Sequence, residues 1–478
     1  MTDEMNYSEF VALCRGEEKI ALTKEEKDRI RESRRAFEEV LRTDAERPYY
    51  GINTGVGALL NKRVPANRMK EFQENLIMSH ACGIGPALEN EIAKGMMLHM
   101  ILNLKKGCSV IRLSTLELLI EMFNRDIIPR VPGKGSLGAS GDLIPQAHIA
   151  LALIGRGDVL CRDSNMLLPS ESVFQNHGLK SAGLEVGEAI ALLNGTSLMT
   201  SYLAFLVFQA DILVETADTV AASTTAILGY DSQSFEDQLH SLRPHPGQIA
   251  TALNLRNILK RKHAERRSSL VQDAYSLRCI PQVHGAFREA LYKARDVANI
   301  EINSFGGNPL ILFEGKKPRI VQGSGNFHGQ ILAQTADSLS IALCGLAGIS
   351  ERRIEHLLND KLSGLPPFLA KTDGLNTGLM IAQYTAAALV SENKTLAHPA
   401  SVDSIPVSAG QEDFVSMGAW AVRKAWEILK NTEYVIAIEA LCAAQASQPE
   451  KDRVLSQDIE KTRRLIHKGG FLDDEANC

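Results

Sequence analysis

Long stretches without proline restrict the fold of this chain more than any other feature. Proline is excluded from helix interiors because it lacks an amide donor and its ring clashes with the preceding turn. The stretches therefore leave room for long helices. They lie between Pro86 and Pro129, between Pro169 and Pro244, between Pro318 and Pro366, and between Pro406 and Pro449.

The apolar residues are spaced as helices require. One series recurs at alternating steps of four and three residues, which places its members on one helix face. Its members are Leu332, Ala336, Leu339, Leu343 and Leu346. A second segment, from Tyr202 to Val214, is apolar on almost every side. This segment predicts a helix buried inside a bundle.

Signals for strands are sparse, whereas one helix start is clearly marked. The alternation typical of strands occurs only in short pieces, such as Ile311 to Val321. Thr23 and Glu26 have the spacing of a capping box, which predicts the first turn of a helix. We therefore predict an all-α (mainly α) fold that is dominated by a long-helix bundle.

Composition and charge exclude several classes of partner. The 478 residues are 45% hydrophobic, the mean hydropathy is -0.08, and the net charge of -5 comes from interspersed charges of both signs. These values are typical of an ordinary globular protein. They predict no nucleic-acid partner and no membrane partner. No apolar run reaches the roughly 18 uncharged residues that span a bilayer.

The cysteines and histidines predict neither disulfides nor a metal site. The eight cysteines are scattered without a CxxC pair, and the twelve histidines show no HExxH spacing. The segment from Met1 to Lys19 is acidic and polar, unlike a signal peptide. We expect a cytoplasmic protein that binds no metal.

Glycine-rich loops between the predicted helices are the most unusual feature of the composition. Such loops are costly unless the backbone must adopt a conformation that other residues avoid. Their sequences are YGINTGVG at 50–57, GKGSLGASG at 133–141, NSFGGNP at 303–309 and GSGNFHG at 323–329.

The tripeptide Ala139-Ser140-Gly141 allows an unusual backbone reaction. In a tight bend the glycine nitrogen can attack the carbonyl two residues upstream, and the serine can lose its hydroxyl as water. The product is an imidazolone ring with an electrophilic methylene carbon. Taken alone, the tripeptide is more simply a helix-entry turn in which Ser140 or Asp142 caps the helix.

The sequence around the tripeptide, GSLGASGDLIPQAHIALALIG, resembles the signature of the aromatic amino-acid ammonia-lyase family. The resemblance extends over nearly the whole chain, in the same order, through YGINTGVG, ALLNGTS, RPHPGQ, QDAYSLRCIPQVHG, GNFHG, SGLPPFL, SENKTLAHPASVDSIP and QEDFVSMG. It implies that Ala139-Ser140-Gly141 forms 4-methylideneimidazol-5-one (MIO), the family's electrophile.

The same resemblance implies an architecture. The family has the long-helix central bundle of the fumarase/aspartase-like superfamily, and it forms homotetramers with shared active sites. We expect an N-terminal region 1–193 with the Tyr50 loop and the tripeptide, a central bundle 194–447 and a C-terminal segment 448–478. Together they would form one continuous lyase fold.

The resemblance also assigns catalytic roles. Tyr50 resembles the base that removes a β-proton, which requires surroundings that lower its pKa, for example through a nearby positive charge. Asn194 resembles the residue that hydrogen-bonds the MIO carbonyl. The substrate amine would add to the MIO methylene and leave as ammonia after the proton transfer.

Further residues resemble the family's substrate contacts. Arg278 corresponds to the carboxylate anchor, since its guanidinium matches a carboxylate with two hydrogen bonds. Tyr275 and Gln272 lie three and six residues before it, on the same side if the segment is helical, and they resemble groups that orient the amine and the ring. Phe327 resembles the residue that packs over the MIO.

Three positions resemble the histidine-specific members of the family. They are His80, Met380 and Glu412. A carboxylate can accept a hydrogen bond from an imidazole N–H, and a polar pocket disfavours a bare phenyl ring. The expected reaction is therefore the conversion of L-histidine to urocanate and ammonia.

Two alternatives remain open. One is a lyase or 2,3-aminomutase for another aromatic amino acid, phenylalanine or tyrosine, and the other is a catalytically silent binding relative. The sequence departs from the family pattern at Val56, Gly307 and Phe414, where relatives usually have phenylalanine, aspartate and, in the histidine type, histidine.

Overall fold

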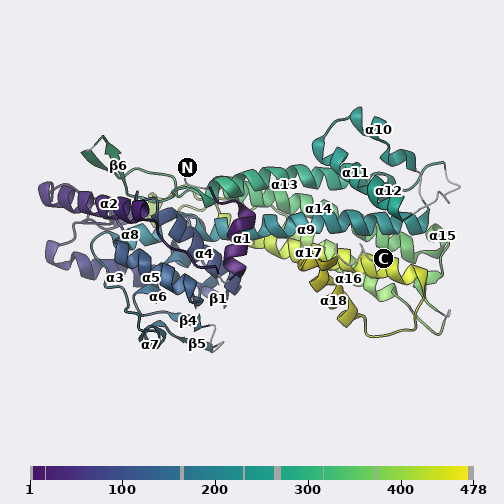
Figure 1. Cartoon of the computed structure of the whole chain (residues 1–478), viewed down its shortest axis with the longest axis horizontal. Helices are drawn as coiled ribbons and strands as arrows, with labels where there is room; N and C mark the ends of the chain where they lie inside the picture. The colour runs from purple at the N-terminus through teal and green to yellow at the C-terminus, as the bar shows by residue number, and fades with distance from the viewer. Residues whose placement is uncertain are drawn as a thin grey trace. The chain divides into compact units, whose positions relative to one another are not determined.

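The structure is a computed structural model, and it is mainly helical (Figure 1). It describes residues 4–16, 18–161, 166–229, 232–262, 271–315, 317–371 and 374–471. The chain forms two compact units. Unit 1 comprises Met1–Phe205, Asp296–Gln334 and Pro399–Val422, and unit 2 comprises Leu206–Arg295, Thr335–His398 and Arg423–Cys478.

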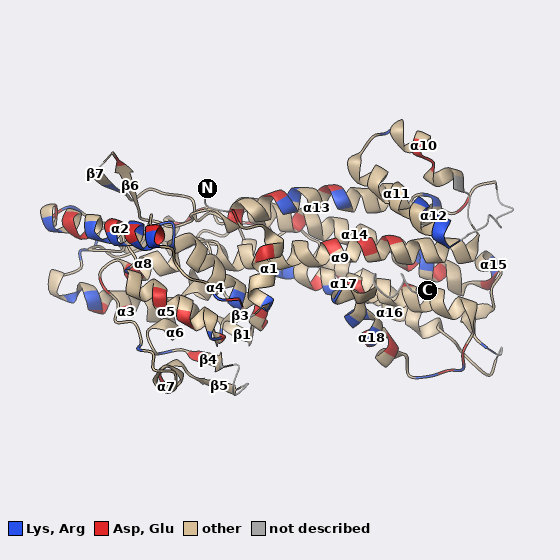
Figure 2. Ribbon diagram, viewed as in Figure 1, with Lys and Arg blue, Asp and Glu red and all other residues tan. Residues whose placement is uncertain are grey.

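Unit 1 contains short and medium helices, three small sheets and the ends of longer helices. Its α-helices are α1 (Tyr7–Arg15), α2 (Lys24–Thr43), α3 (Met69–His80), α4 (Asn90–Leu104), α5 (Leu113–Asn124), α6 (Leu143–Leu153), α7 (Ser170–Asn176) and α8 (Glu188–Leu193). Short 3-10 helices are η1 (Gly57–Leu59), η2 (Ala66–Arg68) and η5 (Ser408–Gly410). Lys, Arg, Asp and Glu are interspersed along α2 rather than separated by sign (Figure 2).

In the described residues, every strand pairs with its neighbours in an antiparallel manner. The strands are β1 (Ile84–Ala87), β2 (Ile127–Pro129), β3 (Pro132–Lys134), β4 (Asp158–Cys161), β5 (Met166–Pro169), β6 (Leu310–Glu314) and β7 (Lys317–Val321). Their sheets are β1-β3, β2-β4-β5 and the hairpin β6-β7. In the hairpin, Leu310 pairs with Val321 and Glu314 with Lys317. This hairpin confirms the strand signal in 311–321.

Four long helices contribute residues to both units. They are α9 (Ser197–Leu228), α13 (Ile280–Ile302), α14 (Gln330–Leu358) and α17 (Gly418–Ser447). The other helices of unit 2 are η3 (Ser232–Phe235), α10 (Asp237–Ser241), α11 (Pro246–Arg261), α12 (Tyr275–Arg278), α15 (Asp360–Ser363), η4 (Pro367–Leu369), α16 (Met380–Leu396) and α18 (Leu455–His467). Within unit 2 the long helices run side by side (Figure 1).

The structure confirms the predicted helix patterns. The Thr23 side chain accepts a hydrogen bond from the Glu26 amide, and the Glu26 carboxylate accepts one from the Thr23 amide. The apolar series from Leu332 to Leu346 is fully buried on one face of α14. The segment from Tyr202 to Val214 lies in α9 and is largely buried, including its polar Gln209.

By length and hydropathy alone, α9 and α14 could cross a bilayer, a property that they share with the core helices of globular proteins. The apolar 18-residue stretches of α9 and α14 are 83% and 56% buried within the structure, respectively.

A buried polar layer joins the four long helices inside unit 2. Arg353 on α14 forms two hydrogen bonds with Glu439 on α17, at 2.6 and 2.8 Å, and both side chains are fully buried. Glu439 also accepts from Thr224 on α9. Nearby on α13, His284 contacts Asp218 of α9 at 2.7 Å. Because unpaired buried charges are costly, such a layer favours one register of the helices.

Candidate active site

The tripeptide lies in a tight bend between β3 and α6. Ser140 and Gly141 have φ angles of +50° and +79°, in the left-handed region that side chains disfavour. The Gly141 amide donates to the Gly138 carbonyl at 3.2 Å. A Cβ atom on Gly141 would overlap the Gly195 carbonyl oxygen and lie 2.8 Å from that of Phe327. The bend therefore fits the backbone cyclisation that produces MIO.

The segment that follows α8 lies directly against this bend. Gly141 and Gly195 form a parallel β-bridge. The Asp142 amide donates to the Gly195 carbonyl at 2.7 Å, and the Gly195 amide approaches the Ser140 carbonyl at 3.5 Å. Asn194 is buried beside these contacts, and its side-chain amide donates to the Ile190 carbonyl at 3.0 Å.

Asp142 lies at the start of α6, but its side chain caps α9. Its Oδ2 accepts from the amides of Leu198 and Met199, at 2.8 and 3.0 Å, in the first turn of α9. As the N-cap residue of α6, Asp142 makes no side-chain hydrogen bond to that helix, so the simpler interpretation of the tripeptide as a helix-entry cap is not supported. Burial raises the pKa of Asp142 to about 7, although both amide donors lower it.

Glu412 connects the tripeptide to two other predicted site residues. The Ser140 hydroxyl donates to Glu412 Oε1 at 3.1 Å. The loop that precedes Glu412 contacts the Tyr50 loop, where Ser408 Oγ accepts from the Ala58 amide at 3.0 Å. The charge of Glu412 raises the pKa of both Tyr50 and His80. Tyr50, His80, Ser140 and Glu412 thus form one group within unit 1.

The surroundings of Tyr50 differ from the prediction. Its Oη accepts a hydrogen bond from the Gly57 amide at 3.0 Å, which lowers its pKa. Burial, the largest effect, and the negative Glu412 both act the other way, so the pKa of Tyr50 is raised overall. In the described part of unit 1, no cation is among the causes of this shift. The expected lowering by positive charge is therefore not found here.

His80 ends α3, in surroundings that favour the neutral form of its ring. Its Nδ1 lies 2.8 Å from the Leu76 carbonyl and 3.1 Å from Ser79 Oγ. Burial lowers the pKa of His80, more than the other groups raise it. Since a carbonyl oxygen only accepts, Nδ1 carries the proton, and Nε2 of the neutral ring is an acceptor.

The loop 326–328, which carries Phe327 and His328, lies against the tripeptide bend. The Phe327 carbonyl is one of the groups that exclude a side chain at Gly141. The next ring, His328, stacks on Phe414 with centroids 6.2 Å apart and an angle of 15°. His328 Nε2 also lies 3.3 Å from the Phe414 carbonyl. Phe414, one of the unusual residues, therefore joins loop 326–328 to the Glu412 segment.

Unit 2 contains the other predicted site residues. Tyr275 and Arg278 lie on α12, with the guanidinium carbon 4.6 Å from the tyrosine ring centroid. Arg278 Nε is buried without a hydrogen-bond partner among the described residues. Met380 begins α16. Gln272 precedes α12, so the predicted helical alignment holds for Tyr275 and Arg278 but is wrong for Gln272.

The other two departures from the family pattern, Gly307 and Val56, lie against neighbouring side chains. A side chain on Gly307 would meet the Phe305 ring, whose nearest atom lies 2.7 Å from the Cβ position. Val56 packs, like Tyr50, against a core cluster that includes Phe37 and Ile52.

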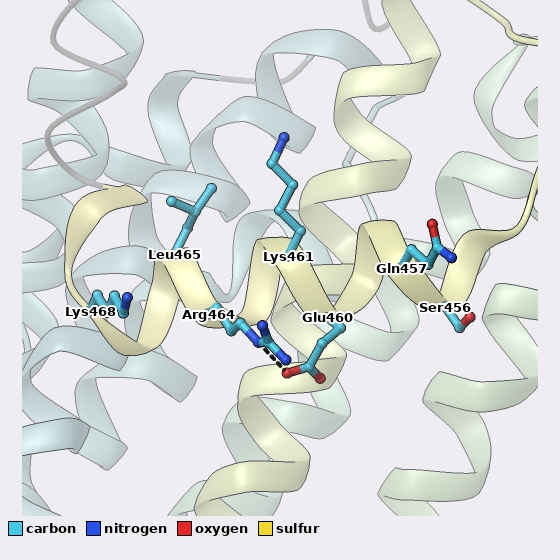
Figure 3. A pocket seen from close by; sticks show the side chains of 7 residues that line it. All are labelled: Ser456, Gln457, Glu460, Lys461, Arg464, Leu465 and Lys468. Atoms are coloured by element: carbon cyan, nitrogen blue, oxygen red, sulfur yellow. Dashed lines mark hydrogen bonds and ion pairs between the residues drawn. The ribbon is translucent and has the colours of Figure 1, made fainter.

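A pocket away from these residues lies along α18 in unit 2 (Figure 3). Its volume is about 550 Å³, and its lining includes Lys461, Arg464 and Lys468. Arg464 is bonded to Glu460 at 2.8 Å. Its described lining contains none of the predicted site residues.

Relatives with known names match nearly the whole chain. The family model described as aromatic amino acid lyase matches residues 5–468. A histidine ammonia-lyase from Deinococcus radiodurans is 46% identical over 92% of this chain and 84% of its own length. One from Alkaliphilus oremlandii is 42% identical over 98% and 97%.

Solved structures agree. Histidine ammonia-lyase from Trypanosoma cruzi has a TM-score of 0.89 and 36% identity, covering 98% of this chain and 93% of that one. Tyrosine aminomutase from Streptomyces globisporus has a TM-score of 0.91 and 34% identity, covering 99% and 97%. With the strained tripeptide and its surrounding loops, these similarities establish that the chain belongs to the aromatic amino acid lyase family.

Proposed function

We propose that this chain converts L-histidine to urocanate and ammonia, with an MIO group formed from Ala139-Ser140-Gly141. The observation that carries the proposal is the group of Tyr50, His80 and Glu412 around Ser140. The histidine ammonia-lyases that match the chain over most of its length support it.

Glu412 and His80 would select the substrate ring. A carboxylate and the Nε2 atom of a neutral histidine both accept hydrogen bonds. An imidazole ring offers N–H donors, whereas a phenyl ring offers none and would leave both acceptors unpaired. Met380 would add an apolar contact, and Phe327 would pack over the MIO.

Residues of unit 2 would hold the rest of the amino acid. The Arg278 guanidinium would bind the α-carboxylate with two parallel hydrogen bonds. Tyr275 and Gln272 would orient the amine. Asn194 would hydrogen-bond the carbonyl of the prosthetic ring.

Tyr50 would take the β-proton on Oη. The Gly57 amide donates a hydrogen bond to Tyr50 Oη and so favours the tyrosinate. The remaining stabilisation requires positive charge, which the Arg278 guanidinium would supply. Once formed, the MIO supplies an electrophilic carbon that makes the substrate amine a better leaving group.

We further propose a cytoplasmic homotetramer with the fumarase/aspartase-like central bundle and shared active sites. The division into 1–193, 194–447 and 448–478, in one continuous lyase fold, stays a prediction.

The test is incubation with L-histidine, L-phenylalanine and L-tyrosine, followed by the ultraviolet bands of urocanate and the cinnamates. We expect urocanate from histidine and a protein lighter than its sequence mass by two water molecules. An unmodified mass would contradict the MIO, and preferential cinnamate or coumarate formation would contradict the histidine assignment.

The structural likeness to a tyrosine aminomutase favours a second candidate, an aromatic 2,3-aminomutase. Chromatography of the amino-acid products separates the two, because a mutase accumulates a β-amino acid. A catalytically silent relative would form no product from any of the three substrates.

A further inference from the structure

The side chain of Gln146 spans the segment that carries Asn194. Gln146 lies on α6, five residues after Gly141, and is 2% exposed. Its Nε2 donates to the Leu192 carbonyl at 2.9 Å, before Asn194. Its Oε1 accepts from the Ser197 amide at 3.3 Å, after Asn194. One amide group therefore fixes both ends of the connection between α8 and α9.

This connection is the part of the backbone that meets the tripeptide. Gly195 has a φ of +144°, and a Cβ on it would lie 3.2 Å from Gln146 Oε1. The Gly195 carbonyl accepts a hydrogen bond from the Asp142 amide, and the Gly195 amide faces the Ser140 carbonyl. A shift of the connection would therefore change the surface against which the tripeptide bends.

We propose that Gln146 is a positioning residue that holds 194–195 against Ala139-Ser140-Gly141, both for ring closure and for the contact of Asn194 with the ring. The inference rests on the proposed function. A glutamine amide has a donor and an acceptor on one plane. A methionine of the same length has neither strong group, and a glutamate carboxylate accepts only.

A simpler role would be helix capping alone. The first three residues of α9 are Ser197, Leu198 and Met199. The Ser197 amide donates to Gln146, and the other two amides donate to Asp142. Free amides at a helix start need such partners. A pure cap would affect stability, but it would leave ring formation and turnover per folded chain unchanged.

The experiment compares Gln146→Met with Gln445→Met in the full-length protein. Gln445 is a matched control in unit 2: it is 6% exposed, donates to the Leu369 carbonyl at 3.1 Å and accepts from Arg453 at 3.0 Å. Intact mass gives the cyclised fraction of chains. Steady-state kinetics with L-histidine give kcat per cyclised chain and KM, and thermal unfolding gives Tm.

We expect Gln146→Met to leave a clear fraction of chains at the uncyclised mass. Its kcat per cyclised chain should fall about tenfold, with KM changed less. Turnover depends more than substrate binding on the exact position of Asn194 at the ring, which Gln146 supports. Gln445→Met should lower Tm while keeping full cyclisation and kcat. Gln146→Asn keeps an amide donor and acceptor on a side chain one carbon shorter, so it should lie between wild type and Gln146→Met and also serves if Gln146→Met does not fold.

Full cyclisation and wild-type kcat in Gln146→Met and Gln146→Asn, with only Tm lowered, would overturn the positioning role. This failure is distinct from failure of the proposed function, in which the wild type itself would lack the mass loss or the turnover of histidine.

Discussion

Gly141 has no room for a side chain, so its substitution tests the proposed ring closure. In Gly141→Ala, the Cβ would collide with the backbone of Gly195 and Phe327, and a φ of +79° would add strain. We expect its tripeptide peptide to keep the unmodified mass in mass spectrometry. Gly183→Ala is the control, since nothing lies within 4 Å of its Cβ position. A fully cyclised Gly141→Ala would contradict the fit.

Glu412 and His80 test specificity at the residue scale. Loss of a hydrogen bond to a charged partner costs about 1.5–3 kcal/mol, so Glu412→Ala should lower histidine turnover by about ten- to hundredfold. His80→Leu should lower it too and raise the relative activity on phenylalanine. The measurement is the ratio of histidine to phenylalanine activity at matched folded fraction.

The control for these variants is Glu427→Ala, whose side chain is 57% exposed. If the ratio stays constant in Glu412→Ala and His80→Leu while stability falls, the two residues only support the pocket wall.

His99 predicts a pH dependence of stability. It is 1% exposed between Ser197 Oγ and the Glu301 carbonyl, and burial lowers its pKa to about 4. Because the folded pKa lies below the unfolded one, its stabilisation is present above about pH 6.5 and is lost as pH falls towards 4. Relative to His99→Gln, the wild type should lose about 2 kcal/mol of unfolding free energy between pH 8 and pH 5.

Denaturant unfolding at both pH values measures this difference. Groups common to both proteins, including Asp142 with its opposite dependence, cancel in the comparison. Exposed His245→Gln is the control. An equal pH dependence in wild type and His99→Gln would contradict the prediction.

Single residues were predictable where a short motif specifies them, and unpredictable where distant segments meet. The strained bend at Ser140 follows from its glycine-rich loop. The raised pKa of Tyr50 does not, because it depends on burial and on Glu412, which is remote in sequence. Gln146 lies within the quoted signature stretch, but the sequence assigned it no role, because its importance lies in contacts with residues about fifty positions away.

At the scale of elements, local patterns were again sufficient and remote pairing was not. The capping box at Thr23 and the α14 seam depend on residues within one helix. The sheets β1-β3 and β2-β4-β5 depend on partners elsewhere in the chain and carried no sequence signal that we could use. Gln272 lies outside α12 because Ala274 is extended, with ψ of 153°.

The buried polar layer of unit 2 predicts a large cost for a single change. Arg353→Met leaves the Glu439 carboxylate buried without its cation, which should cost about 3–5 kcal/mol of unfolding free energy. Arg353→Met combined with Glu439→Leu should recover much of this loss, since apolar residues then replace both charges. Arg464→Met, also in unit 2, is the control, because both side chains of its ion pair with Glu460 are accessible to water, at 69% and 32% exposed.

Denaturant unfolding of the wild type, Arg353→Met, Glu439→Leu, the double variant and the control tests this coupling. A loss in the double variant equal to the sum of both single losses would show that Arg353 and Glu439 act independently, contrary to the prediction.

At the scale of the whole molecule, the predicted site residues are divided between the two units. Tyr50, Ser140, Asn194 and Glu412 belong to unit 1, while Arg278 and the other substrate contacts belong to unit 2. Apolar side chains also remain exposed on the helices of unit 2. Ile341, Ile381 and Tyr384, on α14 and α16, are 55%, 52% and 62% exposed. Exposed apolar helix surface of this kind is typical of protein interfaces.

The proposed tetramer therefore predicts complementation between two inactive variants. Tyr50→Phe removes the base, and Arg278→Ala removes the carboxylate anchor, so each homotetramer should have little activity. If a site takes Tyr50 from one subunit and Arg278 from another, random mixing should make about a quarter of the sites fully wild type. Co-expression with two affinity tags isolates the mixed tetramers, and light scattering gives their mass.

Recovery of about a quarter of wild-type turnover would place the two residues in different subunits. Mixed tetramers that stay at the activity of their parents would mean that both residues come from one chain. Tetramers of two differently tagged Tyr50→Phe chains, prepared in the same way, control for activation by the tags. A stable and active monomer would contradict the shared site altogether, because unit 1 and unit 2 of a single chain would then be sufficient to supply the base, the anchor and the positive charge that a tyrosinate requires.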